Sequence, residues 1–151
     1  MTTQPSTPRP GTPHPSTHLG CQTFRFLTMR WCKTAAAELI AADLDAAELV
    51  DAGIGSLAAF LPGWRTPGAI SLIQIDVDHD HAMSTDLDRP IIAVRIVSDS
   101  GQGYGSIVID GWHRVYRALA EDRTTLPALV LSAAAEKAAR YPLPDLTMWI
   151  S

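Results

Sequence analysis

The segment of this sequence with the residue types best suited to chemistry is Asp110-Gly111-Trp112-His113-Arg114. It follows a β-branched run at 106–109 and precedes a stretch with helical spacing, so the apolar period changes at Gly111. The first turn of a helix presents backbone N–H groups and the positive end of the helix dipole, and His113 and Arg114 add cationic groups there. The segment therefore predicts an anion site, and phosphate is the anion that we expect.

Each residue of this segment has an expected role. Asp110 is expected to cap the helix through its carboxylate, and Gly111 lets a ligand approach the backbone without meeting a Cβ. Trp112 can stack on a nucleobase, but we favour packing, which is commoner for tryptophan. His113 can bind a phosphate, transfer a proton or tie the helix to a neighbouring carbonyl, and the planar donor fork of Arg114 best suits an oxyanion. The simpler interpretation is a capped helix with a glycine turn and no ligand.

A second group of candidate ligands lies upstream. A strand continuing through Asp76, Asp78 and Asp80 would place these carboxylates on one face and His79 and His81 on the other. Such a cluster is suited to a divalent metal, with carboxylates favouring Mg²⁺ and imidazoles favouring Zn²⁺ or Mn²⁺. A solvated acidic loop is the alternative that we favour, because no further ligand follows at a recognised spacing.

The elements around Gly111 come in a definite order. A helix is expected over 114–123 and an apolar strand over 126–131, which begins near Pro127. Upstream, 88–96 reads as another strand, and Gly101-Gln102-Gly103-Tyr104 reads as the hairpin that leads into the 106–109 strand.

Over residues 70–131 these features resemble the ParB/sulfiredoxin superfamily, in which a strand ends in a glycine-containing motif, opens a helix and is followed by a further strand. The resemblance implies an α+β fold, with a small mixed sheet flanked by helices. It also implies that Gly111, His113 and Arg114 contact the phosphates of a nucleotide, ATP or CTP with Mg²⁺. Asp110 and Trp112 complete the expected site.

Departures from the superfamily motifs narrow the implied activity. Trp112 stands where sulfiredoxins carry the catalytic cysteine, so sulfinic acid reduction is not expected. Trp112 and His113 also differ from the Glu-Arg of ParB proteins, and the segment comes nearest to the Asp-Gly-His-His-Arg of free-serine kinases. The resemblance thus implies a nucleotide-binding domain, with phosphotransferase or nucleotidase activity open. The alternative is a non-catalytic DNA- or protein-binding module of the ParB-like type.

Length and charge set the wider limits. The chain has 151 residues, of which 46% are hydrophobic, which suits one domain. Residues 1–23 are rich in Thr, Pro and Ser and are expected to form a disordered tail, leaving a single domain at 24–151 with its core at 70–131. The net charge of −4 disfavours a surface that grips nucleic acid, although Arg114, Arg117 and Arg123 are candidates for a local basic patch.

Patterning outside the core predicts several further elements. The expected elements are a strand over 24–33, helices over 35–42 and 46–52, a short turn over 56–61, a loop over 62–68, a strand over 69–77, a helix over 133–141 capped by Ser132, and an apolar segment over 144–151 that docks on the domain or a partner.

Cys21 and Cys32 lack Cys-x-x-Cys spacing, and two cysteines alone fit a reducing compartment better than a disulfide framework.

No run of about twenty apolar residues and no signal peptide is evident, so we expect a cytoplasmic protein with no membrane partner. Because folded-looking sequence begins at Met29, we also expect translation to start there, and a mass spectrum showing a terminus at Thr2 would refute this.

Overall fold

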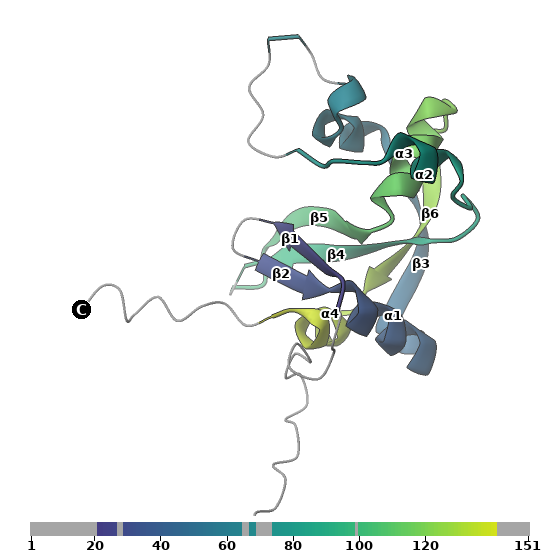
Figure 1. The fold of residues 1–151 in the computed structure, drawn as a ribbon. Helices are drawn as coiled ribbons and strands as arrows, with labels where there is room; N and C mark the ends of the chain where they lie inside the picture. Colours follow the sequence, from purple (N-terminus) through teal and green to yellow (C-terminus); the bar gives the residue numbers. More distant parts are fainter. Residues whose placement is uncertain (1–20, 27–28, 65–66, 69–73, 99, 142–151) are drawn as a thin grey trace, which may run out of the picture. The chain divides into compact units, whose positions relative to one another are not determined.

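The computed structural model describes residues 21–26, 29–64, 67–68, 74–98 and 100–141. The predicted tail up to residue 20, most of the predicted 69–77 strand and the apolar segment at 144–151 lie outside the described residues. The described chain divides into two compact units. One spans Ala47–Val130, and the other combines the residues up to Ala46 with those from Leu131 onward. Figure 1 shows their elements.

A four-stranded mixed sheet forms the centre of the Ala47–Val130 unit. Its strands lie in the order β3 (Ala47–Gly53), β6 (Thr125–Leu131), β4 (Ile91–Val97) and β5 (Gly103–Asp110). β4 pairs antiparallel with β5 and parallel with β6. The predicted α+β class with a small mixed sheet is confirmed.

Helix α3 (Trp112–Ala120) connects β5 to β6. Ile109, Val94 and Val115 are fully buried in this unit, which agrees with the apolar patterns of β5, β4 and α3. The helix begins two residues before the predicted 114–123 helix and ends three residues earlier. The chain thus runs from strand through Gly111 to helix and back to strand, in the predicted order.

The predicted helix over 46–52 is wrong. A short 3-10 turn, η1 (Leu44–Ala46), is followed by β3, which neighbours β6 in the sheet. Helix propensity in an Ala-Glu-Leu stretch amounts to a few tenths of a kcal/mol per residue, so pairing with a neighbouring strand overrides it.

The segment before β4 also differs from the predicted strand. Residues 74–78 have no regular structure, and helix α2 (His79–Met83) follows them. The Asp78 carboxylate starts α2 by accepting a hydrogen bond from His81 N at 2.9 Å. Asp and Asn favour such caps, which compete with extended backbone. The loop between β3 and this segment contains two 3-10 helices, η2 (Gly55–Phe60) and η3 (Pro62–Trp64), in agreement with the expected turn and loop.

The other unit contains the hairpin of β1 (Thr23–Phe26) and β2 (Met29–Cys32), with helices α1 (Lys33–Ala42) and α4 (Ala133–Ala139). The predicted single strand over 24–33 is therefore two strands, and a chain that began at Met29 would lack β1. Trp31 is fully buried and donates from Nε1 to Glu136 in α4 at 3.0 Å. Ser132 caps α4 as predicted, accepting from Ala135 N at 3.1 Å.

Cys21 and Cys32 form a disulfide, so the prediction of two unpaired thiols is wrong. The β1–β2 hairpin brings residues 21 and 32 side by side, with their Cα atoms 5.9 Å apart, and linear spacing does not reveal this neighbourhood. Residues 21–23, the end of the predicted tail, take part in this bond and in β1. None of the helices in the described ranges has the length and apolar character needed to span a bilayer.

Candidate functional site

Gly111 forms the corner between β5 and α3. Its φ of +104° lies in the left-handed region, where side chains are strained, and it occupies the N-cap position of α3. A Cβ at this position would lie 2.6 Å from Ile91 Cγ2 and 2.8 Å from Arg114 Nη2. The corner therefore needs glycine for two reasons, its backbone conformation and its close contact with β4.

The N-terminus of α3 has no side-chain cap, so the expected role of Asp110 as a cap is wrong. The Asp110 carboxylate instead lies 4.0 Å from Arg114 Nη2. This follows from the left-handed Gly111, because the turn places Gly111 rather than Asp110 at the N-cap. Among the described residues, no side-chain hydrogen bond caps the start of α3, where the positive end of the helix dipole lies.

Arg114 is largely buried, with an exposed fraction of 8%. Its Nη2 donates to the backbone carbonyl of Pro90 at 3.0 Å, just before β4. Burial lowers the pKa of the Arg114 guanidinium, and the charge of Asp110 partly opposes this shift. Nε is also buried and has no hydrogen-bond partner among the described residues. The side chain that was expected to face an oxyanion is therefore largely engaged in joining α3 to β4.

Trp112 packs into the unit with an exposed fraction of 7%. Its Nε1 donates to Val108 O at 2.8 Å, and its ring meets Phe60 edge to face with the centroids 5.9 Å apart. A ring held in this way is occupied on its polar edge, so the structure agrees with the packing role that we favoured over base stacking.

His113 lies next to α2. This contact brings the 110–114 segment and the 76–81 segment together. Asp78 N donates to His113 Nε2 at 3.4 Å, and the rings of His81 and His113 meet edge to face at 4.5 Å. One turn along α3, Tyr116 Oη lies 3.0 Å from His79 Nδ1. We call His79, His81, His113 and Tyr116 the imidazole cluster. The sequence suggested the histidines separately, but only the packing of α2 on α3 brings them together.

The three aspartates of the upstream segment do not share a strand face. Asp76 accepts from Gln74 Nε2 at 3.1 Å, Asp78 caps α2, and Asp80 is exposed within that helix. The pKa of Asp78 is lowered, chiefly because its carboxylate accepts the hydrogen bond from His81 N. Within the described residues, no group of three or more His, Cys, Asp or Glu side chains is arranged to hold a metal ion.

The arginines of α3 and the following turn do not gather into a basic patch. Arg114 is buried, and Arg117 pairs with Glu121 at 3.1 Å. Arg123 lines a hollow of about 190 Å³ together with Asp86, Leu87, Asp88, Arg117 and Glu121. Carboxylates therefore lie beside these positive charges. This arrangement disfavours nucleic-acid binding on this side of α3.

The chain matches no family model, no curated protein and no solved structure. The site must therefore be interpreted from its own geometry.

Proposed function

We propose that the Ala47–Val130 unit is a ParB/sulfiredoxin-like domain that binds a nucleotide, with a phosphate at the N-terminus of α3. The observation that carries this proposal is the uncapped start of α3 at a left-handed glycine, with His113 in the first turn. The backbone amides of a first helical turn and the helix dipole favour an anion at such a place. The order of β5, Gly111, α3 and β6 is also the order on which the resemblance rests.

Two further features support an anion at this corner. The imidazoles of His81 and His113 lie in contact at the first turn of α3, where their ring N–H groups are of a donor type that suits an anion. The buried Nε of Arg114 lacks an acceptor among the described residues, and an unsatisfied buried donor costs about 1–3 kcal/mol. The Nη2 atom of the same guanidinium would lie 2.8 Å from a Cβ at Gly111, so the positive charge of Arg114 lies beside the corner and favours an anion there.

Mg²⁺ would come with the nucleotide in this proposal. ATP and CTP carry phosphate oxygens that bind Mg²⁺, which usually uses only one or two protein carboxylates. Asp76 and Asp80 are the exposed carboxylates of the upstream segment, and Asp78 already serves as a cap. Phosphotransferase or nucleotidase activity is the catalytic form of the proposal, and its products are measured directly as released phosphate or a phosphorylated acceptor.

Thermal denaturation with ATP, CTP and GTP, each with and without Mg²⁺, tests the proposal. We expect one of them to raise the melting temperature, because a ligand at about 100 times its Kd stabilises a protein by about 2.7 kcal/mol. His113→Gln should reduce this shift. Arg95→Gln, which removes an exposed charge on β4, should keep it.

Arg114→Ala is a poor test of ligand contact, because Arg114 also holds Pro90 and its loss would destabilise the domain. No shift with any nucleotide would refute the proposal. Retardation of duplex DNA without a nucleotide response would favour the non-catalytic DNA-binding alternative.

A further inference from the structure

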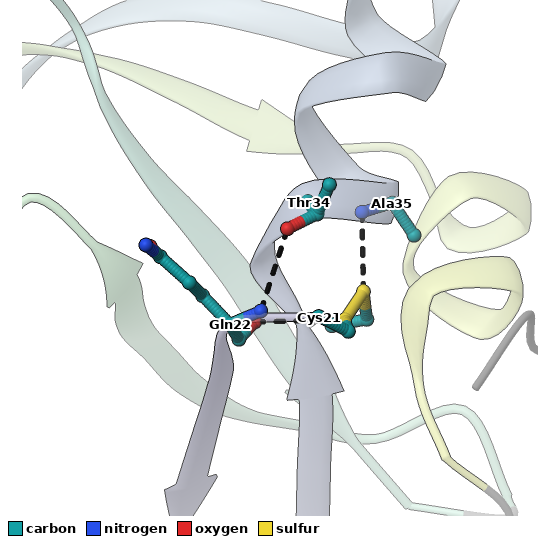
Figure 2. The surroundings of a disulfide bond; sticks show 5 residues. Cys21, Gln22, Thr34 and Ala35 are labelled. Atoms are coloured by element: carbon teal, nitrogen blue, oxygen red, sulfur yellow. Dashed lines mark hydrogen bonds between the residues drawn. A yellow bond between two sulfur atoms is a disulfide. The ribbon is translucent and has the colours of Figure 1, made fainter. Parts of the chain in front are cut away.

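The two sulfurs of the Cys21–Cys32 disulfide have opposite hydrogen-bonding surroundings (Figure 2). Cys32 is the N-cap of α1, and its Sγ accepts a hydrogen bond from Ala35 N at 3.2 Å. Cys21 Sγ instead lies 3.7 Å from an acceptor, the carbonyl oxygen of Gln22, which does not stabilise negative charge on sulfur. The surroundings thus favour negative charge on Cys32 more than on Cys21.

Access to the two sulfurs is also unequal. Cys32 has an exposed fraction of 1%, whereas Cys21 is half-buried. Thiol–disulfide exchange begins when a thiolate attacks one sulfur, and the rate depends on which sulfur is accessible and how well the other leaves. Cys21 is the more exposed residue, and the Ala35 amide stabilises negative charge on Cys32, so both requirements favour attack on Cys21.

The hairpin holds the two cysteines together by bonds other than the disulfide. Lys33 N donates to Gln22 O at 2.7 Å. Gln22 N donates to Thr34 Oγ1 at 3.4 Å (Figure 2). Thr23 and Cys32 are also partners in the β1–β2 ladder. Cleavage of the S–S bond therefore leaves the sulfurs close enough to form it again.

We propose that Cys21–Cys32 is a reversible thiol–disulfide exchange site, at which a thiol of low molecular weight or a dithiol reacts with Cys21 and releases Cys32. The attacking thiolate forms a bond to Cys21 Sγ, the Cys21–Cys32 bond breaks, and its electron pair leaves on Cys32 as a thiolate. A second thiolate then attacks the sulfur of the reagent and releases Cys21. The protein gains two electrons, the two reagent thiols become a disulfide, and their protons pass to the cysteines or to solvent.

The first test uses the unmodified chain with reduced glutathione, quenched by acid and mapped by mass spectrometry of peptides. The glutathione adduct is expected on Cys21, about ten-fold or more in excess over Cys32. Equal adducts, an adduct mainly on Cys32, or a disulfide that resists reduction until the chain is unfolded would overturn the proposal.

The second test compares the thiols in single-cysteine chains. Cys21→Ser leaves Cys32 alone at the start of α1, and Cys32→Ser is the matched control because serine is a favourable N-cap. Thiolate absorbance followed against pH should show Cys32 ionising at lower pH than Cys21, with at least about a ten-fold greater thiolate fraction near neutral pH. The same or the reverse order, in chains shown by circular dichroism to be folded, would overturn the assignment.

Discussion

Gly111 is subject to a conformational and a steric constraint at once. Its positive φ excludes most side chains, and Ile91 leaves no room for a Cβ. Gly105 has a similar φ of +112°, but a Cβ there meets nothing within 4 Å. A comparison of substitutions at the two glycines therefore distinguishes the cost of backbone strain from the cost of close packing.

We expect Gly111→Ala to lower the free energy of unfolding by about 2–5 kcal/mol, since backbone strain and overpacking add. Gly105→Ala should cost only the strain, about 1–2 kcal/mol. Urea unfolding of both variants measures the difference. Equal losses would show that Ile91 moves aside, and the steric part of the argument would fail.

Arg114 has an unusually clear structural role for a charged residue. Its Nη2 joins α3 to the residue before β4, and its aliphatic stem is buried with it. A side chain that only contacts a ligand would be dispensable for stability, so stability distinguishes the two roles.

Arg114→Ala should lower the free energy of unfolding by about 2–4 kcal/mol, because Pro90 O loses its donor and the stem leaves a void. Arg95→Ala, which breaks only an exposed ion pair with Glu48, should cost about 0–1 kcal/mol. Chemical denaturation without ligand provides the comparison. A loss for Arg114→Ala no larger than that for Arg95→Ala would instead indicate a side chain kept for ligand contact.

Helix α2 has only five residues, so its start depends strongly on Asp78. The carboxylate accepts from His81 N, and the backbone of the same residue donates to His113. Asp78 therefore connects the cap of α2 to the imidazole cluster.

The lowered pKa of Asp78 predicts a pH dependence of stability. The stabilisation is present above the pKa of an unfolded aspartate, about 3.9, and is lost as the pH falls through the lower folded value. Asp78→Asn keeps a favourable cap but does not titrate. The stability advantage of the native chain over this variant should shrink between about pH 5 and pH 2, as measured by urea unfolding. An advantage that stays constant over this range would contradict the assignment.

Sequence reasoning located the elements whose patterns are strongest. The change of period at Gly111, the β5–α3–β6 order and the Ser132 cap are local features, so they were predictable. The local pattern of β3 predicts a helix, because its pairing with β6 is non-local. The buried position of Arg114 is not predictable for the same reason, since it depends on Pro90, which is distant in sequence.

In the molecule as a whole, the two proposed sites lie in different compact units. The proposed phosphate site at Gly111 belongs to the Ala47–Val130 unit, and the disulfide belongs to the unit that contains β1, β2, α1 and α4. Each site uses the start of a helix, with backbone amides of α3 at one and Ala35 N at the other.

Reduction of the disulfide is expected to destabilise the chain without dispersing the hairpin. The cysteines are 11 residues apart. In the chain-entropy account, a cross-link that closes a loop of this length lowers the entropy of the unfolded chain and so raises its free energy by about 3 kcal/mol. We expect dithiothreitol to lower the free energy of unfolding by about 2–3 kcal/mol in urea titrations followed by circular dichroism. The double variant Cys21→Ser/Cys32→Ser should match the reduced chain and show no response to dithiothreitol. If the oxidised and reduced chains unfold at the same urea concentration, the disulfide adds no constraint beyond that of the β1–β2 ladder.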